Sequence, residues 1–328
     1  MRKELNIVGK KKIFALISLT LLVLGLICNL VLGTRMNIQF TGGTIIKYSY
    51  TGEVSKADMQ KALAETTGGK ETYSFSYDVV TTAKDSNPNN VSVSLPVKDK
   101  LTTAQLADML DHLQKAFPEA NFREIESSTV EATMGREFFG KCMVAIALAA
   151  ILMLVYVAIR FRKIGGWSAG LMALLALLND VLISYFVFVV FRIELDDNFV
   201  AVVLSILGYS INSTIVIYDR VRENRRVMGA GADIAEVANR SINQSLRRSL
   251  FTSITTFISV TCITVVALIF GLDSILSFSV PMMFGIASGF YTSTFLAVPL
   301  WVGLRQHMAR RRAAKAERAN ASKPKAKK

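Results

Sequence analysis

The sequence predicts a polytopic α-helical membrane protein with six transmembrane helices and an extracytoplasmic ferredoxin-like α+β domain between helices 1 and 2. Three observations support this prediction. Of the 328 residues, 52% are hydrophobic and only 19% are charged, whereas soluble domains average about a quarter charged. The apolar residues gather in six blocks, each near or above the ~18–20 residues that cross a bilayer as a helix. One long polar segment with alternating strand and helix patterns separates the first block from the second.

The first block is expected to stay as a helix and not to be cleaved as a signal peptide. Its apolar stretch exceeds the ~7–15 residues of a signal core, and no small-x-small site follows. By residue range, we expect a cytoplasmic basic arm at 1–12, the first transmembrane helix at 13–33, the extracytoplasmic domain at 34–140, the second to fourth helices at 141–160, 164–191 and 198–218, a cytoplasmic amphipathic loop at 219–248, the fifth and sixth helices at 249–272 and 278–304, and a basic cytoplasmic tail at 305–328.

The basic residues are unevenly distributed. Most of the 38 Lys and Arg residues lie in the N-terminal arm, the loop at 160–163, the loop at 219–248 and the tail. The domain at 34–140 is mildly acidic. This positive-inside pattern predicts a multi-pass protein of the cytoplasmic membrane with both termini in the cytoplasm. The net charge of +13 is therefore explained by topology, and no nucleic-acid partner is expected. The tail is predicted to be disordered and drawn to anionic lipid.

The same composition excludes several classes of protein: a soluble enzyme, a transcription factor and a secreted disulfide scaffold. Cys28, Cys142 and Cys262 all fall in apolar blocks, where they are simplest to interpret as small core residues. Neither His112 nor His307 lies in a predicted span, so no metal site is expected.

The outside segment has the strand–helix–strand–strand–helix–strand order of a split βαβ sandwich. Alternating apolar residues predict the strands, and the 3.6-residue period predicts the helices. The second helix places Met109 and Leu113 on one face with Leu106 and Leu110. The expected strands are 43–50, 71–82, 89–97 and 121–132, and the expected helices are 55–67 and 101–117.

Asp180 is the only ionisable side chain well inside a predicted span. The helical rise of ~1.5 Å per residue places it roughly 20 Å from the cytoplasmic face. A bare carboxylate there costs several kcal/mol, so it must be paired, hydrated or protonated. Two interpretations stay open: a structural carboxylic acid bonded to a neighbouring helix, or a proton- or ion-linked site.

Hydroxyl and amide side chains form stripes on two of the predicted helices. Such stripes serve either as packing contacts between helices or as a path for protons and water. The residues are Ser205, Tyr209, Asn212 and Ser213 on helix 4, and Thr252, Thr256 and Ser259 on helix 5.

Helix 6 carries Gly285 and Gly289 four residues apart, a spacing that favours close helix packing. Pro281 and Pro299 lie near its expected ends, where a kink is least costly. In the loop at 219–248, apolar residues recur at helical spacing, which predicts an amphipathic helix on the cytoplasmic membrane surface that runs into helix 5. These apolar residues are Ile234, Val237, Ile242 and Leu246.

Charged residues cluster where helix 4 meets the cytoplasm. Opposite charges this close are expected to pair at the interface, and a simple membrane anchor is the alternative. The residues are Asp219, Arg220, Arg222 and Glu223. Arg248 opens helix 5 and is expected either to snorkel to the membrane surface or to face the helix 4 stripe.

Three motifs point to a known family. They are GYSINSTIVIYDRVREN through the end of helix 4, FTGGT after helix 1, which contains Gly42 and Gly43, and LRRSLFTSITT at the start of helix 5. Together they resemble the SecF family of bacterial protein-export membrane subunits, in the resistance–nodulation–division superfamily. The resemblance covers nearly the whole chain.

That resemblance implies a subunit of the Sec translocase that pairs with SecD and associates with SecYEG, often also with YidC. It implies movement of unfolded secretory polypeptide across the membrane, driven by a proton or sodium gradient. It implies no catalytic cleavage and no organic cofactor, with H⁺ or Na⁺ as the coupling ion.

The chain departs from the family pattern at its helix 4 motif. Ser213 follows Asn212 where the family commonly has a proton-carrying Asp, and Asn179 precedes Asp180 where a His is usual. The family's helix 3 carboxylate and helix 5 arginine match Asp180 and Arg248. Three mechanisms follow: Asp180 carries the ion, SecD carries it alone, or coupling is lost and the subunit is a scaffold. We favour the second, with Asp180 assisting and nearby amides and hydroxyls coordinating water or Na⁺.

Three other functions are alternatives to this one. A non-conducting scaffold for SecD is the most serious, because of Ser213. Half of a small-molecule efflux transporter of the same superfamily would also need a partner chain. An intramembrane aspartyl protease would need two facing carboxylates, and Asp219 lies at the membrane edge beside Arg220.

Overall fold

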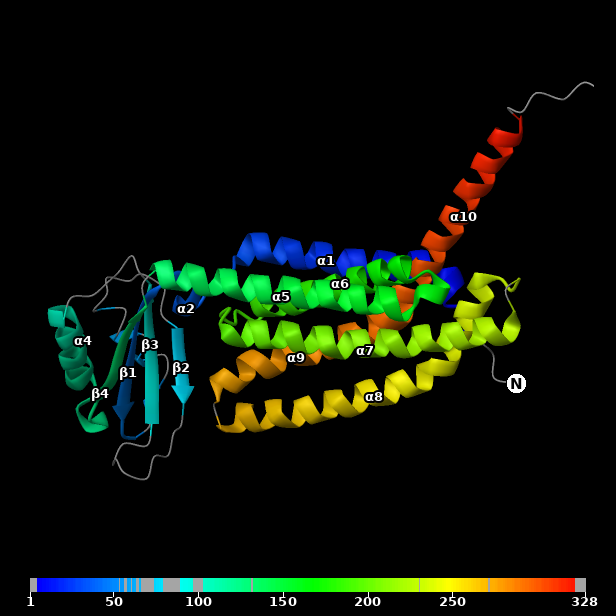
Figure 1. Ribbon diagram of the computed structural model, residues 1–328. Helices are drawn as coiled ribbons and strands as arrows, with labels where there is room; N and C mark the ends of the chain where they lie inside the picture. Colours follow the sequence, from blue (N-terminus) through cyan, green and yellow to red (C-terminus); the bar gives the residue numbers. More distant parts are fainter. Residues whose placement is uncertain are drawn as a thin grey trace, which may run out of the picture.

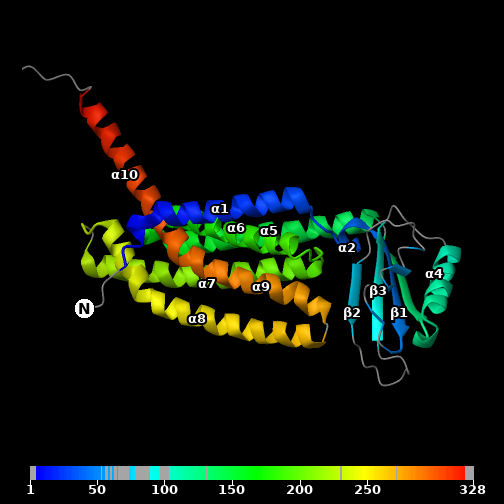
Figure 2. The same ribbon diagram turned by 180° about the vertical axis from the view of Figure 1, so that it is seen from behind.

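A computed structural model describes residues 5–52, 54–55, 58–59, 61–62, 65, 74–78, 89–96, 103–130, 132–229, 231–270 and 272–321. A long helical bundle makes up most of the molecule, and a small antiparallel sheet with a covering helix lies at one end of it (Figure 1). The beginning of α1 (Lys11–Leu32) and the far end of α10 (Val298–Ala321) lie at the opposite end (Figure 2).

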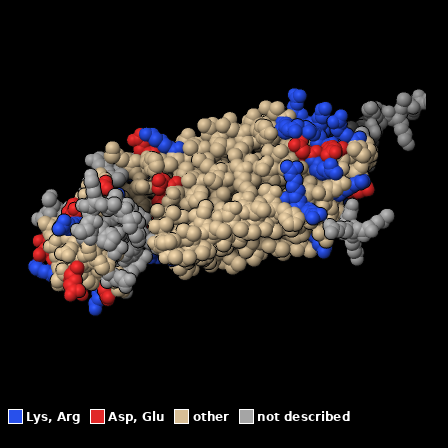
Figure 3. All heavy atoms as spheres, turned by 90° about the horizontal axis from the view of Figure 1, so that it is seen from below, with Lys and Arg blue, Asp and Glu red and all other residues tan. Residues whose placement is uncertain are grey.

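Six helical stretches of the described chain are long and apolar enough to cross a membrane, which confirms the predicted number. Viewed from below, Lys and Arg gather at the end of the bundle away from the sheet, and the middle of that face carries almost no charge (Figure 3). The helices are α1 (Lys11–Leu32), α5 (Ala132–Arg160), α6 (Gly166–Val190), α7 (Asp197–Met228), α8 (Ile234–Phe270), and α9 (Asp273–Tyr291) followed by α10 (Val298–Ala321).

Helices α6 and α7 form the centre of the bundle. Their most apolar windows are 56% and 50% buried, against 11% for α1 and 17% for both α5 and α8. Helix α6 contacts α1, α5, α7 and α9. The outer helices instead expose rows of Leu, Ile, Val and Phe, as a surface that faces lipid must.

The helix α8 has 37 residues and would span about 55 Å at 1.5 Å per residue, well beyond a ~30 Å bilayer core. The predicted loop at 219–248 is therefore divided between the end of α7 and the start of α8. Val237 and Ile242 are 1% and 0% exposed and belong to the same core as Ile7 and Val8. The expectation that this apolar face lies on the membrane surface is wrong, because the protein's own N-terminal segment and α7 cover it.

The sixth span is interrupted. A π-helical turn at Thr292–Ala297 separates α9 from α10. Pro299 follows at once and has no N–H to bond the carbonyl four residues earlier, which is the usual cause of such a break. Pro281 lies inside α9. The helix then continues to Ala321, so the expected disorder of the tail is wrong up to that residue.

The outer domain contains a four-stranded antiparallel sheet in the order β2–β3–β1–β4. Tyr48 in the central strand is fully buried, and this burial, helped by the negative charge of Glu124, raises the pKa of its phenol. Met109 and Leu113 of α4 close the core, as the sequence predicts. The elements are β1 (Gly43–Tyr50), β2 (Ser74–Asp78), β3 (Asn89–Pro96), α4 (Thr103–Ala116) and β4 (Arg123–Val130), with short 3₁₀ turns at Val8–Lys10, Pro118–Ala120 and Arg162–Ile164.

This order matches the predicted pattern strand by strand. The helix expected at 55–67, between β1 and β2, lies in large part outside the described residues. The ferredoxin-like assignment therefore stays a prediction, while the four-stranded sheet and α4 are observed.

The sheet is joined to the bundle by the segment after α1. Asn37 caps the short helix α2 (Ile38–Thr41) and also donates from Nδ2 to Glu194, between α6 and α7, at 2.9 Å. A single bridge pairs Met36 with Leu195. Helix α5 begins at Ala132, nine residues before the span expected from residue 141, and continues into the bundle.

Candidate functional site

A buried polar site in the described part of the bundle is built around Asp180. It lies in the middle of α6, on the face that packs against α7 and α9, and its exposed fraction is 0%. A carboxylate removed from water in this way must be neutralised or fully hydrogen-bonded.

Three hydroxyl groups from two other helices donate to this carboxylate. Ser210 Oγ of α7 lies 2.6 Å from Oδ2, and Ser288 Oγ of α9 lies 2.6 Å from Oδ1. Thr292 Oγ1, in the π-helical turn, lies 2.9 Å from both oxygens. The carboxylate is thus tied to α7, α9 and the break in the sixth span at once.

Neutral groups alone surround Asp180 in the part of the chain that the structure describes. Asn179 donates to Ser288 at 3.5 Å and accepts from Ser18 of α1, which extends the network to a fourth helix. No arginine or lysine pairs with the carboxylate among these residues. A proton or a small cation is what could cancel the charge, so the site has the chemistry of an ion-binding group that links helices.

Two glycines permit the close approach of α9. A Cβ on Gly289 would lie 3.2 Å from Ser210 Cβ, and a Cβ on Gly285 would lie 2.1 Å from Ile206 Cδ1. The Gly285–Gly289 face therefore lies directly against α7, and Ser288 and Thr292 reach Asp180 from this position.

Three ligands of the carboxylate were missed by sequence reasoning: Ser210, Ser288 and Thr292. Ser288 and Thr292 are four residues apart and alternate with Gly285 and Gly289, so they lie on the face expected to pack closely. This spacing is the feature of the sequence that could have identified Ser288 and Thr292. Ser210 stands next to the predicted stripe on helix 4 but points to the other side.

The residues of the stripe predicted on helix 4 lie in different surroundings. Asn212 is exposed, whereas Ser213 is buried at 7% exposure. Tyr209 Oη donates to Ser253 Oγ of α8 at 2.8 Å. This bond joins α7 to α8, on a different side of α7 from Asp180.

The candidates on α8 are not gathered at Asp180. Arg248 and Thr252 are exposed, and Thr256 is half-buried. Thr252 Oγ1 donates to the Arg248 carbonyl and Thr256 Oγ1 to the Thr252 carbonyl, each at 2.9 Å. In the described chain these hydroxyls therefore satisfy themselves on their own helix.

The charged motif after helix 4 ties three helices together. Asp219 lies 3.1 Å from Arg160 of α5 and 2.9 Å from Arg222 one turn on. Arg220 lies 2.6 Å from both Glu223 and Gln244 of α8. All of these groups are at least partly exposed, so their role is to hold α5, α7 and α8 in position at this end.

Gly42 and Gly43 lie at the start of the sheet domain. Their φ angles of +81° and +154° fall in a region that other residues rarely adopt, and they turn the chain from α2 into β1. Among the described residues, no three His, Cys, Asp or Glu side chains group as metal ligands would.

The sequence profile described as "Protein export membrane protein SecD/SecF, C-terminal" matches residues 109–307. The chain belongs to the SecD/SecF family. It is 32% identical to the protein translocase subunit SecF of Sebaldella termitidis over 92% of both chains, and 34% identical to that of Thermobaculum terrenum over 91% of this chain and 93% of the relative.

The SecD/SecF family also includes longer relatives. The protein translocase subunit SecDF of Bacillus subtilis is 30% identical over 90% of this chain but only 37% of its own length. The crystal structure of SecDF from Thermus thermophilus, a translocon-associated membrane protein, superposes with a TM-score of 0.73 at 28% identity, over 93% of this chain and 39% of that one. Six apolar helices and this membership identify a multi-pass membrane protein.

Proposed function

We propose that this protein is an auxiliary subunit of the Sec protein-export machinery, acting with SecD and SecYEG to promote ion-gradient-driven translocation of unfolded polypeptides across the cytoplasmic membrane. Relatives of matching length are named protein translocase subunit SecF, and a relative more than twice as long is named SecDF. The second fact favours SecD as the partner, since this chain corresponds to less than half of that fused protein. YidC is a further candidate partner.

The single observation that supports coupling to H⁺ or Na⁺ is the carboxylate of Asp180, held by hydroxyls from α7 and α9 and by no cation in the described chain. A change in its charge would alter bonds to three elements at once. One of these elements is the π-helical turn, a feature often found at functional sites.

The remaining parts of the proposal concern topology. We place both termini in the cytoplasm and the sheet domain, with a complete ferredoxin-like fold, on the outer side, where it would contact emerging polypeptide. The basic end of the bundle in Figure 3 supports this orientation through the positive-inside rule. No organic cofactor and no catalytic reaction are proposed.

The experiment is a pulse-chase of a secreted protein in cells that carry Asp180→Asn, with and without collapse of the ion gradient. We expect the gradient-dependent acceleration to be reduced, because the amide cannot carry the charge with which Asp180 would assist SecD. Asp197→Asn is the matched control, since that carboxylate is exposed at the start of α7. Full gradient-dependent export in Asp180→Asn would remove this residue from the mechanism.

A non-conducting scaffold for SecD is the second candidate. Ser213 favours it, because a hydroxyl replaces the carboxylate usual in the family. Thr252 and Thr256 of α8 also favour it, because their hydroxyls donate to carbonyls of their own helix. In that case Asp180→Asn would leave the gradient response intact, while depletion of the subunit would slow export. Ser213→Asp, compared with Ser213→Ala, should then strengthen the gradient response. Export unchanged on depletion would favour half of a small-molecule efflux transporter instead.

A further inference from the structure

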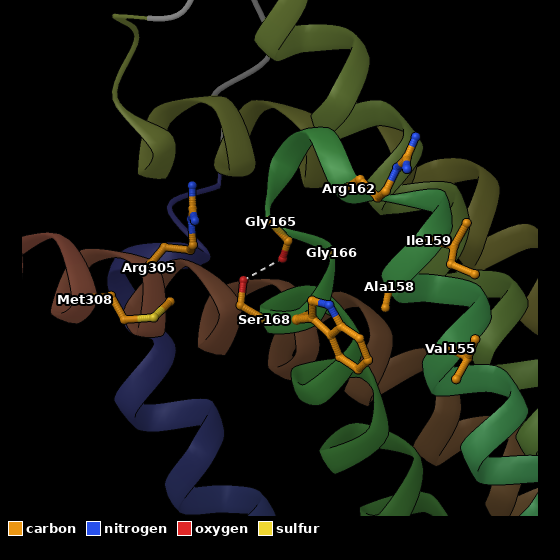
Figure 4. Close-up of a pocket in the computed structure, with 10 residues that line it drawn as sticks. Val155, Ala158, Ile159, Arg162, Gly165, Gly166, Ser168, Arg305 and Met308 are labelled. Atoms are coloured by element: carbon orange, nitrogen blue, oxygen red, sulfur yellow. Dashed lines mark hydrogen bonds between the residues drawn. The ribbon is translucent and has the colours of Figure 1, made fainter.

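An open cavity of about 560 Å³ lies where α5 ends, α6 begins and α10 passes. Figure 4 shows its walls. The cavity is at the end of the bundle that carries the termini, far from Asp180 and from the sheet. It is lined by Val155, Ala158, Ile159, Arg162, Gly165, Gly166, Trp167, Ser168, Arg305 and Met308.

Two arginines, Arg162 and Arg305, line this cavity from different helical segments. The Arg305 guanidinium lies against Gly165, so close that a Cβ on this glycine would be 2.9 Å from Nη1. Arg162 stands in the turn between α5 and α6. Neither arginine forms an ion pair within the described residues. Arg225, Arg312 and one acid, Asp233, line an adjoining hollow with Arg305. Positive charge is therefore in excess around the cavity.

The first turn of α6 adds hydrogen-bond donors. Within the described chain, the amides of Gly166 and Trp167 have no acceptor. Ser168 does not cap them, because its hydroxyl donates to the Gly165 carbonyl at 2.7 Å and accepts from Trp301 at 3.2 Å. An anion beside Arg162 and Arg305 would meet these amides and the positive end of a 25-residue helix.

The remaining wall is apolar and is exposed on the outside of the bundle. Ile159 and Trp167 are 63% and 73% exposed, and Val155 continues the same face of α5 toward the middle of the bundle. Exposed tryptophan at the end of a span is typical of the bilayer interface. The cavity thus combines two arginines at one end with an apolar groove beside them.

We propose that this cavity binds one anionic phospholipid, with the phosphate against Arg162, Arg305 and the α6 amides and an acyl chain along Val155, Ile159 and Trp167. Charge complementarity and the apolar groove favour a lipid over a soluble phosphate compound. The bound lipid would hold α5, α6 and α10 together, and this role does not depend on the export function.

The chain offers a direct probe. It has two tryptophans, of which Trp167 lines the cavity and Trp301 is 0% exposed. The full-length protein is reconstituted in phosphatidylcholine containing increasing fractions of phosphatidylglycerol with brominated acyl chains, and tryptophan quenching is compared with that by brominated phosphatidylcholine. Trp167→Phe supplies the signal of Trp301 alone.

We expect brominated phosphatidylglycerol to quench Trp167 at a much lower fraction than brominated phosphatidylcholine. Arg162→Gln with Arg305→Gln should reduce this preference by about fivefold for each arginine. Arg310→Gln with Arg311→Gln removes the same charge from an exposed part of α10 and should leave most of the preference.

Equal quenching by the two lipids would overturn the proposal, and so would equal losses in the two double variants, which would indicate only general attraction to a basic surface. Displacement of the brominated lipid by millimolar inorganic phosphate would also overturn it, in favour of a site for a soluble phosphate compound.

Discussion

Two sets of hydroxyl side chains in this bundle have similar composition and different surroundings. Around Asp180, Ser210, Ser288 and Thr292 donate to a carboxylate on another helix. On α8, Thr252 and Thr256 donate to carbonyls of the preceding turn of their own helix. The first set is buried between three helices, whereas the second lies on an outer helix.

The difference shows what a polar stripe in a membrane helix depends on. A hydroxyl within a helix can always return its proton to the carbonyl four residues earlier, so its presence predicts no interhelical bond. It becomes part of a site only where a neighbouring helix presents an acceptor that has no other partner. Asp180 supplies that acceptor, whereas the hydroxyls of Thr252 and Thr256 donate to their own helix in the described chain.

The largest effect is expected when hydrogen-bond donors to Asp180 are removed. Ser288→Ala with Thr292→Val should lower the free energy of unfolding by about 3 kcal/mol or more, because a buried carboxylate loses most of its hydrogen bonds. Adding Asp180→Leu should recover most of this loss, since no charge then remains. The measurement is an unfolding titration with sodium dodecyl sulfate in mixed micelles. A double variant as stable as the parent would show that these bonds are not important.

A second test concerns the close approach of α9. Gly285→Ala should cost about 1–3 kcal/mol, because the new Cβ would meet Ile206 in a filled core. Gly208→Ala on α7 is the control, since nothing lies within 4 Å of its added Cβ, and it should stabilise the helix by up to about 1 kcal/mol. Thermal unfolding in detergent compares the two. Equal shifts would contradict the packing described for α9.

A smaller effect is expected where α7 meets α8. Tyr209→Phe removes the 2.8 Å bond to Ser253 and keeps the ring. Interhelical hydrogen bonds in membranes contribute about 0.6 kcal/mol on average, so we expect a loss of that size. In the Ser253→Ala background the same substitution should have almost no effect. Additive losses in this double-mutant cycle would mean that the two side chains do not interact.

The smallest effect is expected on α8 itself. Thr252→Val should change stability by less than about 0.5 kcal/mol and leave gradient-dependent export unchanged, because its hydroxyl serves only the backbone of its own helix. Pulse-chase export and thermal unfolding test this. A loss of gradient dependence comparable to that of Asp180→Asn would place α8 in the ion pathway after all.

The sequence identified the central carboxylate, but only part of its surroundings. Asp180 was evident because one acid in an apolar block is costly. Ser288 and Thr292 share the face of Gly285 and Gly289, yet a face does not tell which neighbouring helix it meets. The stripe through Tyr209 and Asn212 does not predict the role of Ser210, because Ser210 points to α6 and Tyr209 points to α8.

Other differences have the same origin. The apolar side of 234–246 predicts a helix on the membrane surface. The sequence cannot show that the N-terminal segment with Ile7 and Val8 covers this side instead. The tail was expected to be disordered from its charge, yet α10 extends to Ala321 as the continuation of a long helix. In both places the local composition indicates which side chains are polar, but it does not indicate which segment packs against them.

The sequence alone determined four properties: the six spans, the order of strands along the outer domain, the charge asymmetry and the presence of one buried acid. These properties depend on hydrophobicity and periodicity, which are local. Tertiary structure alone decided which hydroxyls reach Asp180, which helices stand at the centre, and where two arginines and the first turn of α6 form one cavity. Each of these requires side chains from distant segments to meet, and helix packing determines such meetings through surface shape that no single stretch of sequence contains.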